Sequence, residues 1–113
     1  MSCLFNSLSK FVNISPQNLR QQICDFLRTN PSILDDIKVS EVINWENGMN
    51  IHTYINNMEQ YSTWGGGIEI KCFCEIYQLG VSIIHNNRQI EFIPSSGNHT
   101  SIITLNYTGN HYY

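Results

Sequence analysis

The sequence has no alanine, only three prolines and few charged side chains. Lysine, arginine, aspartate and glutamate make up 13% of its 113 residues, and the formal net charge is -3 at pH 7. The six basic residues are scattered singly, so the chain lacks the basic patch that nucleic-acid binding requires. These absences argue against a nucleic-acid partner and leave a globular protein with a lightly charged surface.

Long apolar runs are missing as well. No stretch approaches the ~20 apolar residues that span a bilayer, and the N terminus lacks the basic-then-apolar pattern of a signal peptide. Cysteine is too sparse for a disulfide-rich secreted scaffold, so we expect all four cysteines to be reduced. The sequence therefore predicts a cytoplasmic protein without a membrane partner, folded as a single domain over residues 1–113.

Apolar residues recur at helical spacing in five segments of the first two thirds of the chain. These segments cover residues 2–11, 16–29, 40–47, 50–60 and 68–79. Ser2 and Ser15 are suitable N-cap residues, and Gly48 and Gly80 follow segments that a glycine can end. A cap at Ser2 would make Cys3 the first residue of the first helix.

The pattern changes to strands after the fifth helix. Residues 81–86 and 88–93 are rich in β-branched side chains, and the Asn86-Asn87 pair between them tolerates a tight hairpin turn. Residues 101–107 predict a third strand after a polar loop. Helices followed by a mostly antiparallel sheet predict an α+β fold, with N-terminal helices packed on a small C-terminal sheet.

Cys3 near one end of the chain and His111 near the other form a candidate catalytic pair. The free N–H groups and the dipole of a helix N terminus favour the thiolate form of a cysteine. His111 follows the last predicted strand, and it can serve as base and acid if that strand packs on the first helix. His99 is a rival base in a similar "GNH" context, but it precedes its strand and lacks the following aromatic residue, so we favour His111.

Three stretches resemble the ovarian tumour (OTU) family of cysteine deubiquitinases. The first is "CLFNSLS", which is similar to the family's nucleophile motif D-G-x-C-[LF]-[FYW]-x-[SA]. The second runs from "YINNMEQ" through "WGGGIE" to "VSIIHN" and resembles the Y-x-x-x-M…W-G-G-x-x-E block and the strand after it. The third, "ITLNYTGNHYY", resembles the I-x-L-x-Y…x-H-[YFW] box that ends the family's domain.

The resemblance implies an OTU-like fold and a role for particular residues. Cys3 matches the nucleophile and His111 the general base, with an oxyanion hole formed by backbone N–H groups at and before the cysteine. Tyr112 matches an aromatic residue that lines the channel for the substrate tail. Trp64 and Gly65 of the W-G-G block are, by the same resemblance, expected substrate-binding positions beside the site. The resemblance implies no metal or organic cofactor.

Two positions depart from the family pattern. The motif aspartate that lies three residues before the nucleophile would precede Met1. Tyr113 occupies the position where many members carry the Asp or Asn that orients the histidine. Asn98, Asn106 and Asn110 are other candidates for that orienting role.

The activity implied is cleavage of the (iso)peptide bond after the C-terminal Gly-Gly of ubiquitin or a ubiquitin-like modifier. Two alternatives stay open: a catalytically impaired OTU-fold module that binds ubiquitin, and a thiol peptidase with another substrate. The expected partner is ubiquitin and the expected state is a monomer. The lack of alanine and the many asparagines and isoleucines are typical of an AT-rich genome, which favours a viral or parasite protein acting in the host cytoplasm.

The other cysteines have simpler interpretations. Cys72 and Cys74 form a C-x-C pair, but a structural zinc site needs four converging ligands and the sequence offers no second pair. We expect them, with Cys24, to be structural and free of metal.

Several histidines and aromatic residues also have structural interpretations. His52, His85 and His99 are expected at the surface or in turns. Trp45 and Tyr61 belong either to the core or to a binding face, and we favour the core. Glu69, the acid of the W-G-G-x-x-E block, is expected to be a structural hydrogen-bonding group.

Overall fold

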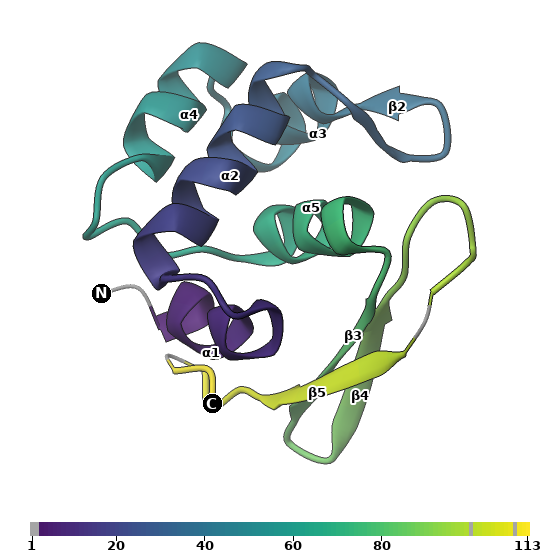
Figure 1. The fold of residues 1–113 in the computed structure, drawn as a ribbon. Coiled ribbons are helices and arrows are strands. Elements are labelled where there is room, and N and C mark those ends of the chain that lie inside the picture. Colours follow the sequence, from purple (N-terminus) through teal and green to yellow (C-terminus); the bar gives the residue numbers. More distant parts are fainter. Residues whose placement is uncertain (1–2, 100, 110) are drawn as a thin grey trace.

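Helices come first and the main sheet comes last, as the sequence predicts (Figure 1). The computed structural model describes residues 3–99, 101–109 and 111–113, and of Cys3 it describes the backbone. Over these residues the helices are α1 (Cys3–Val12), α2 (Pro16–Arg28), α3 (Val39–Asn47), α4 (Ile51–Met58) and α5 (Gly67–Tyr77). The strands are β1 (Ser32–Leu34), β2 (Ile37–Lys38), β3 (Gly80–His85), β4 (Arg88–Phe92) and β5 (Ile102–Asn106). None of the helices in the described part is long and apolar enough to cross a bilayer.

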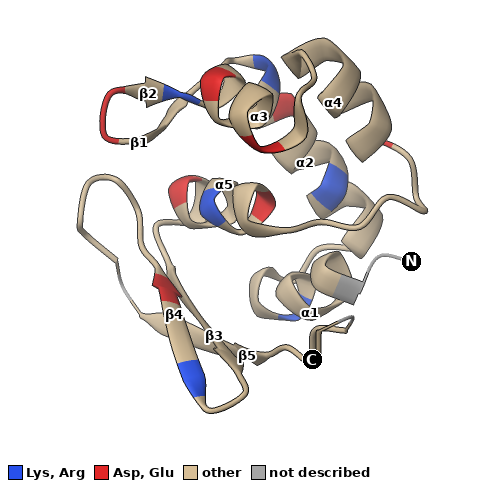
Figure 2. Cartoon of the chain, turned by 180° about the vertical axis from the view of Figure 1, so that it is seen from behind, with Lys and Arg blue, Asp and Glu red and all other residues tan. Residues whose placement is uncertain are grey.

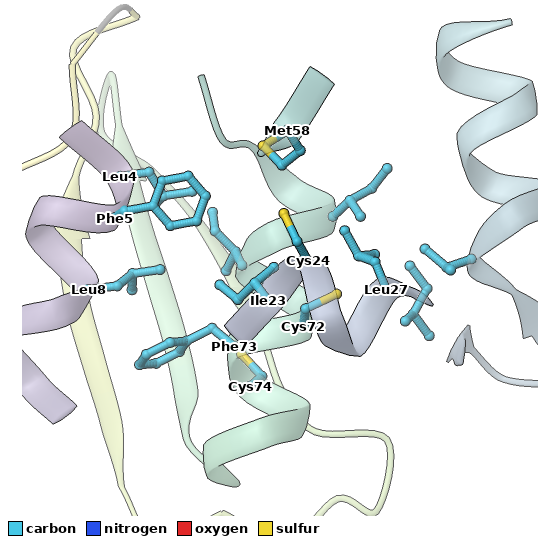
Figure 3. Packing of buried hydrophobic residues seen from close by; sticks show 14 of the residues in the cluster. Leu4, Phe5, Leu8, Ile23, Cys24, Leu27, Met58, Cys72, Phe73 and Cys74 are labelled. Carbon is cyan, nitrogen blue, oxygen red and sulfur yellow. The ribbon is translucent and has the colours of Figure 1, made fainter. Parts of the chain in front are cut away.

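Helix α5 lies in the middle of the molecule. It contacts α2 on one side and strands β3 and β4 on the other, and α1 packs against α2 (Figure 1). The apolar stripes of these helices converge on one core, in which Leu4, Phe5 and Leu8 of α1 point toward Ile23 of α2 and Phe73 of α5 (Figure 3). The start of α1 is therefore fixed by buried side chains directly after Cys3.

Short polar side chains set the helix boundaries. The Ser15 hydroxyl accepts a hydrogen bond from the Asn18 N–H at 3.1 Å, which confirms it as the N-cap of α2. Gly48 ends α3 in the left-handed conformation, with φ of 65°. Asn50 caps α4 through a 2.8 Å bond from the Thr53 N–H. The predicted cap Ser2 lies outside the described residues.

The predicted role of Gly80 as a helix terminator is wrong. Gln78 takes the left-handed position after α5, with φ of 54°, and Gly80 opens β3. A Cβ atom at Gly80 would lie 2.9 Å from Cγ1 of Ile102 on the neighbouring strand. Gly80 is therefore needed for the close approach of β3 and β5, a tertiary constraint that local sequence does not contain.

The main sheet has the strand order β4-β3-β5. β3 and β4 form the predicted antiparallel hairpin, and Asn86 and Asn87 take positive φ values of 52° and 64° in its turn. β5 pairs with β3 in parallel, so the prediction of a mostly antiparallel sheet is wrong for this strand. The reason is the loop after β4, which returns the chain to the end where β3 begins, and the Gly80 N–H donates to the Ser101 carbonyl there at 2.9 Å.

A second, two-stranded sheet was not predicted. β1 and β2 pair in antiparallel fashion around a turn in which Asp35 has φ of 52°. Strands of two and three residues are too short to show an alternating pattern in the sequence. The turn carries Asp35 and Asp36 at the surface, as their polarity predicts.

Two predicted core residues are exposed. Trp45 is 67% exposed and Tyr61 is 70% exposed, so their assignment to the core is wrong. Trp45 lies off the buried face of α3, which consists of Val39, Val42 and Ile43. Tyr61 lies in the turn between α4 and α5, where neither helix covers its ring.

Candidate active site

Cys3 is the first residue of helix α1, as predicted. The next two side chains, Leu4 and Phe5, are no more than 1% exposed and hold the first turn of α1 in the core. The residues before Cys3, which would include the oxyanion loop implied by the family motif, lie outside the described part of the chain.

The chain reverses after β5 in a tight C-terminal hairpin (residues 106–109 and 111–113). Asn106 and Tyr113 exchange two backbone hydrogen bonds of 2.8 and 2.9 Å, and the rings of Tyr107 and Tyr112 stack with centroids 4.5 Å apart. The Thr108 N–H donates to the His111 carbonyl at 3.0 Å, which closes the turn. The imidazole of His111 is exposed and stacks against the ring of Tyr113 at 6.1 Å.

The C-terminal hairpin lies against α1. The Ser7 hydroxyl donates to the Tyr112 carbonyl at 3.1 Å, a contact between residues 105 positions apart in sequence. Figures 1 and 2 both draw the C terminus beside α1. Residues four apart share one face of a helix, so Ser7 and Cys3 belong to the same face, about 6 Å apart along the axis. The hairpin that carries His111 therefore contacts the same face of α1 on which Cys3 lies.

The W-G-G segment packs on the same helix turn. A Cβ atom at Gly65 would lie 2.8 Å from Cδ2 of Leu4 and 3.0 Å from the ring of Phe5, so any larger residue must displace these side chains. Trp64 precedes it and is 48% exposed. Trp64 also lines a cleft of about 340 Å³ with Tyr54 and other residues from α3 to α5; His111 is not among the lining residues.

Glu69 holds the W-G-G segment to α5 and α4. Its carboxylate accepts from the Gly66 N–H at 2.7 Å and from the Tyr54 hydroxyl at 2.5 Å, and its side chain is 1% exposed. Burial raises the pKa of Glu69 above the ordinary carboxyl value, because the charged form loses its hydration. These bonds confirm the expected structural role.

Arg20 is a buried cation that sequence reasoning missed. Its guanidinium is 4.3 Å from the ring centroid of Phe5, and it donates to the carbonyls of Met58 at 2.7 Å and Tyr61 at 3.1 Å. Burial lowers the pKa of Arg20. It thus connects α1 and α2 with the segment that leads to Trp64. Its position on one helical stripe with Ile23 and other buried residues of α2 is a signal that could have revealed it.

The histidines fall into different surroundings. His52 and His99 are exposed, as predicted. His99 lies in the loop before β5, which Ser95 ties to Glu75 near the C-terminal end of α5 by a 2.9 Å bond from its N–H. β5 separates this loop from the C-terminal hairpin, so His99 is remote from α1 (Figure 1).

His85, expected at the surface or in a turn, lies in the last position of β3 just before the Asn86-Asn87 turn. It is half-buried at the end of β3, and its Nδ1 lies 2.8 Å from the Tyr107 carbonyl oxygen. It therefore contacts the base of the C-terminal hairpin.

The candidates for an orienting residue are not equivalent. Asn98 lies in the loop on the far side of β5 from His111. The backbone of Asn106 pairs with Tyr113, and Asn110 lies outside the described residues.

The remaining cysteines are structural, as predicted. Cys24, Cys72 and Cys74 are buried, free thiols in the core (Figure 3). Burial raises the pKa of Cys24 to about 12 and that of Cys74 to about 11, and it also raises the pKa of Cys72. Among the described residues no group of three or more His, Cys, Asp or Glu side chains is placed to hold a metal ion.

Comparison with solved structures identifies the fold. The chain superimposes on an OTU domain solved in complex with ubiquitin with a TM-score of 0.77 at 18% identity, over 97% of this chain and 60% of that one. It matches the OTU domain of OTUD1 with a TM-score of 0.71 at 16% identity, over 97% of this chain and 75% of that one. It matches the viral OTU domain protease of Dera Ghazi Khan virus with a TM-score of 0.66 at 16% identity, over 97% of this chain and 70% of that one. The α+β fold is therefore the OTU fold.

Sequence comparison agrees with this result. Protein 232R of Invertebrate iridescent virus 3, named as a candidate ubiquitin thioesterase, is 28% identical over 99% of this chain. The chain spans only 14% of the length of that viral protein. The profile of the OTU-like cysteine proteases matches residues 2–112. The chain belongs to the OTU-like cysteine protease family.

Proposed function

We propose that the chain is a deubiquitinase that cleaves the (iso)peptide bond after the C-terminal Gly-Gly of ubiquitin or a ubiquitin-like modifier. Cys3 is the nucleophile and His111 the general base. The observation that carries the proposal is the hydrogen bond from Ser7 to the Tyr112 carbonyl, which joins the helix of Cys3 to the hairpin of His111. Membership of the OTU-like cysteine protease family supports it independently.

The first step needs a thiolate at the start of α1. The free N–H groups and dipole of this helix terminus favour the anion, whereas burial favours the protonated form of the three other cysteines. The Cys3 sulfur forms a bond to the carbonyl carbon of the terminal glycine. The negative charge moves to the carbonyl oxygen, which backbone N–H groups can stabilise.

His111 moves the protons. As imidazolium it donates a proton to the leaving amine while the C–N bond breaks, and a thioester remains on Cys3. The neutral imidazole then takes a proton from water, which hydrolyses the thioester and restores the thiolate. An exposed position at the tip of a backbone-paired turn suits a group that must reach substrate and solvent. Stacking on Tyr113 supports the ring where other members of the family use an Asp or Asn.

The substrate tail would run between Tyr112 and the W-G-G segment. The Tyr112 carbonyl bonds to Ser7 and Gly65 packs against Leu4 and Phe5, so both segments contact the first two turns of α1. Trp64 adds an exposed indole beside them. Ubiquitin as the substrate is supported by the ubiquitin-bound OTU domain of the same fold and by the name of the viral relative.

Ubiquitin with a C-terminal electrophile tests the nucleophile. We expect one covalent adduct on Cys3 and none after Cys3→Ala, while Cys24→Ser still forms the adduct. Binding without an adduct would favour the impaired ubiquitin-binding module. Cleavage of peptides that lack a terminal Gly-Gly, without reaction with ubiquitin, would favour a peptidase with another substrate.

Paired histidine variants test the base. We expect His111→Ala to lower kcat about 100-fold or more, in the range of general acid–base catalysis, and His99→Ala to leave it unchanged. The reverse result would assign the base to His99.

A further inference from the structure

His85 lies outside the active-site residues named so far, yet it contacts the hairpin that carries His111. It ends β3, and its Nδ1 lies 2.8 Å from the Tyr107 carbonyl oxygen. On the other side of the ring, the Asn86 side-chain amide lies 3.1 Å from Nε2. An amide N–H can only donate, so the proton of the neutral ring belongs on Nδ1, which donates it to Tyr107.

The ring of His85 also supports the turn of the hairpin. The imidazole of His85 packs against the Tyr107 ring in a tilted arrangement, with the two ring centroids 5.2 Å apart. Gly109 has φ of 108°, and a Cβ atom there would lie 3.8 Å from Cε1 of His85. The Tyr107 hydroxyl donates to the Gly109 carbonyl at 2.7 Å. His85 thus contacts Tyr107 at the base of the hairpin, and its Cε1 lies beside Gly109, where only an added methyl group would reach it.

These contacts give the hairpin a second attachment. Its first attachment is to α1, through Ser7 and Tyr112. The second is to the end of β3, where Tyr107 receives the His85 proton and donates its own N–H to the Ile84 carbonyl at 2.9 Å. The backbone bond is part of the sheet, whereas the imidazole bond is the side-chain contribution that a substitution can remove.

We propose that His85 is a positioning residue for the reaction: its Nδ1–H and ring hold Tyr107, whose hydroxyl bonds to Gly109, and through Tyr107 they hold the hairpin so that His111 reaches the N terminus of α1. The inference rests on the proposed function, in which His111 is the base. His85 touches neither substrate nor nucleophile in this role. Its loss should therefore affect the rate of the chemical step more than the binding of ubiquitin.

Two substitutions separate the hydrogen bond from the packing of the ring. His85→Phe keeps a ring of similar shape and removes the Nδ1–H donor. His85→Asn places an amide N–H near the Nδ1 position and removes most of the ring. His52→Phe, at an exposed position on α4, is the matched control.

We expect His85→Phe to lower kcat on a ubiquitin C-terminal conjugate about 10-fold, with KM changed less than about twofold. His85→Asn should recover most of this loss, and His52→Phe should match the wild type. Equal kcat in His85→Phe and wild type would overturn the proposal. So would a decrease that only follows the fraction unfolded, measured by urea denaturation, or a loss carried by KM alone.

Hydrogen exchange separates this inference from the proposed function. The Thr108 and Tyr113 N–H groups pair within the hairpin, so their exchange reports its order whether or not the protein cleaves ubiquitin. We expect faster exchange at both amides in His85→Phe and wild-type rates in His52→Phe. Unchanged exchange in His85→Phe refutes the positioning role, whereas an inactive wild type with normal exchange refutes only the proposed function.

Discussion

The core around α5 and the contact between the two ends of the chain are built from different interactions. In the core, apolar side chains surround buried thiols (Figure 3). The polar groups of Glu69 and Arg20 are each paired there. Where α1 meets the C-terminal hairpin, the Ser7 hydroxyl bonds to the Tyr112 carbonyl, and within the hairpin the rings of Tyr107 and Tyr112 stack. No charged residue occurs from residue 92 to the C terminus, and Figure 2 shows the charges gathered mainly on the helices.

The difference separates stability from reactivity. Burial keeps thiols protonated and gives strong resistance to unfolding, so the core is suited to hold a shape. At the contact between the chain ends, a few polar groups attach the C-terminal hairpin, and His111 stays accessible to solvent. Substitutions in the core should therefore act on the free energy of unfolding, and substitutions at the chain ends should act chiefly on catalysis.

The largest effect is expected from Glu69→Ala. This change leaves the Tyr54 hydroxyl and the Gly66 N–H without their acceptor inside the protein. We expect the free energy of unfolding to fall by about 3 kcal/mol, since each unsatisfied buried group costs about 1–3 kcal/mol. Urea denaturation measures it. Tyr54→Phe, which removes only the donor hydroxyl, should cost less, and an equal or larger loss would contradict this account.

Gly65→Ala should have the next largest effect. The added methyl group would lie 2.8 Å from Leu4 and 3.0 Å from Phe5, and overpacking of this kind costs about 1–3 kcal/mol. Because the clash falls on the first turn of α1, the labelling of Cys3 by a ubiquitin electrophile should also slow. Gly67→Ala is the control, since its methyl group would lie 3.8 Å from Phe92. Equal free energies of unfolding in the two variants would show that the first turn of α1 shifts to admit the methyl group without losing stability.

Ser7→Ala tests the contact between the chain ends directly. Removing the bond to the Tyr112 carbonyl should lower the free energy of unfolding by about 1 kcal/mol. We expect kcat to fall by more than this small loss of stability alone would cause, because the hairpin of His111 loses its attachment to α1. Ser9→Ala is the matched control in the same helix, since the Ser9 hydroxyl bonds to the Asn6 carbonyl. Comparable losses of kcat in both variants would argue against a special role for the Ser7 bond.

The smallest effect is a pH dependence within the core. Burial raises the pKa of Glu69 in the folded state, so the folded chain binds this proton more tightly than the unfolded chain. Stability must then fall as the pH rises from the ordinary carboxyl range toward the raised folded value. Glu69→Gln cannot titrate, so relative to wild type it should gain stability over this interval. Urea denaturation at a series of pH values measures the difference, and a constant difference would rule out the raised pKa.

The helices could be predicted well because their information is local. Ser15 caps α2 and Gly48 ends α3 through contacts with residues no more than four positions away. The apolar stripe of α2 shows directly in its sequence. Trp45 shows the limit, because its hydrophobicity predicts burial while its position on α3 turns it away from the core.

The candidate site could be predicted only in part. The sequence patterns predicted that Cys3 begins a helix and that His111 follows a strand. The family motifs predicted that the two residues act together. His85 and Arg20 could not be assigned in the same way, since their partners lie 22 and 38 positions away or more. A residue type alone does not say which distant carbonyl it will meet.

The sequence by itself determined the helical segments and the β3–β4 hairpin, because helix caps, turn residues and apolar periodicity act over a few neighbouring residues. The family was recognised from the three motif stretches, which are also read directly from the sequence. The tertiary structure alone decided that β5 runs parallel to β3, that Gly80 and Gly65 are sites of close packing, and that His85 meets the Tyr107 carbonyl. These features depend on which surfaces meet when distant segments bury their apolar side chains together, and that choice is made by the whole chain.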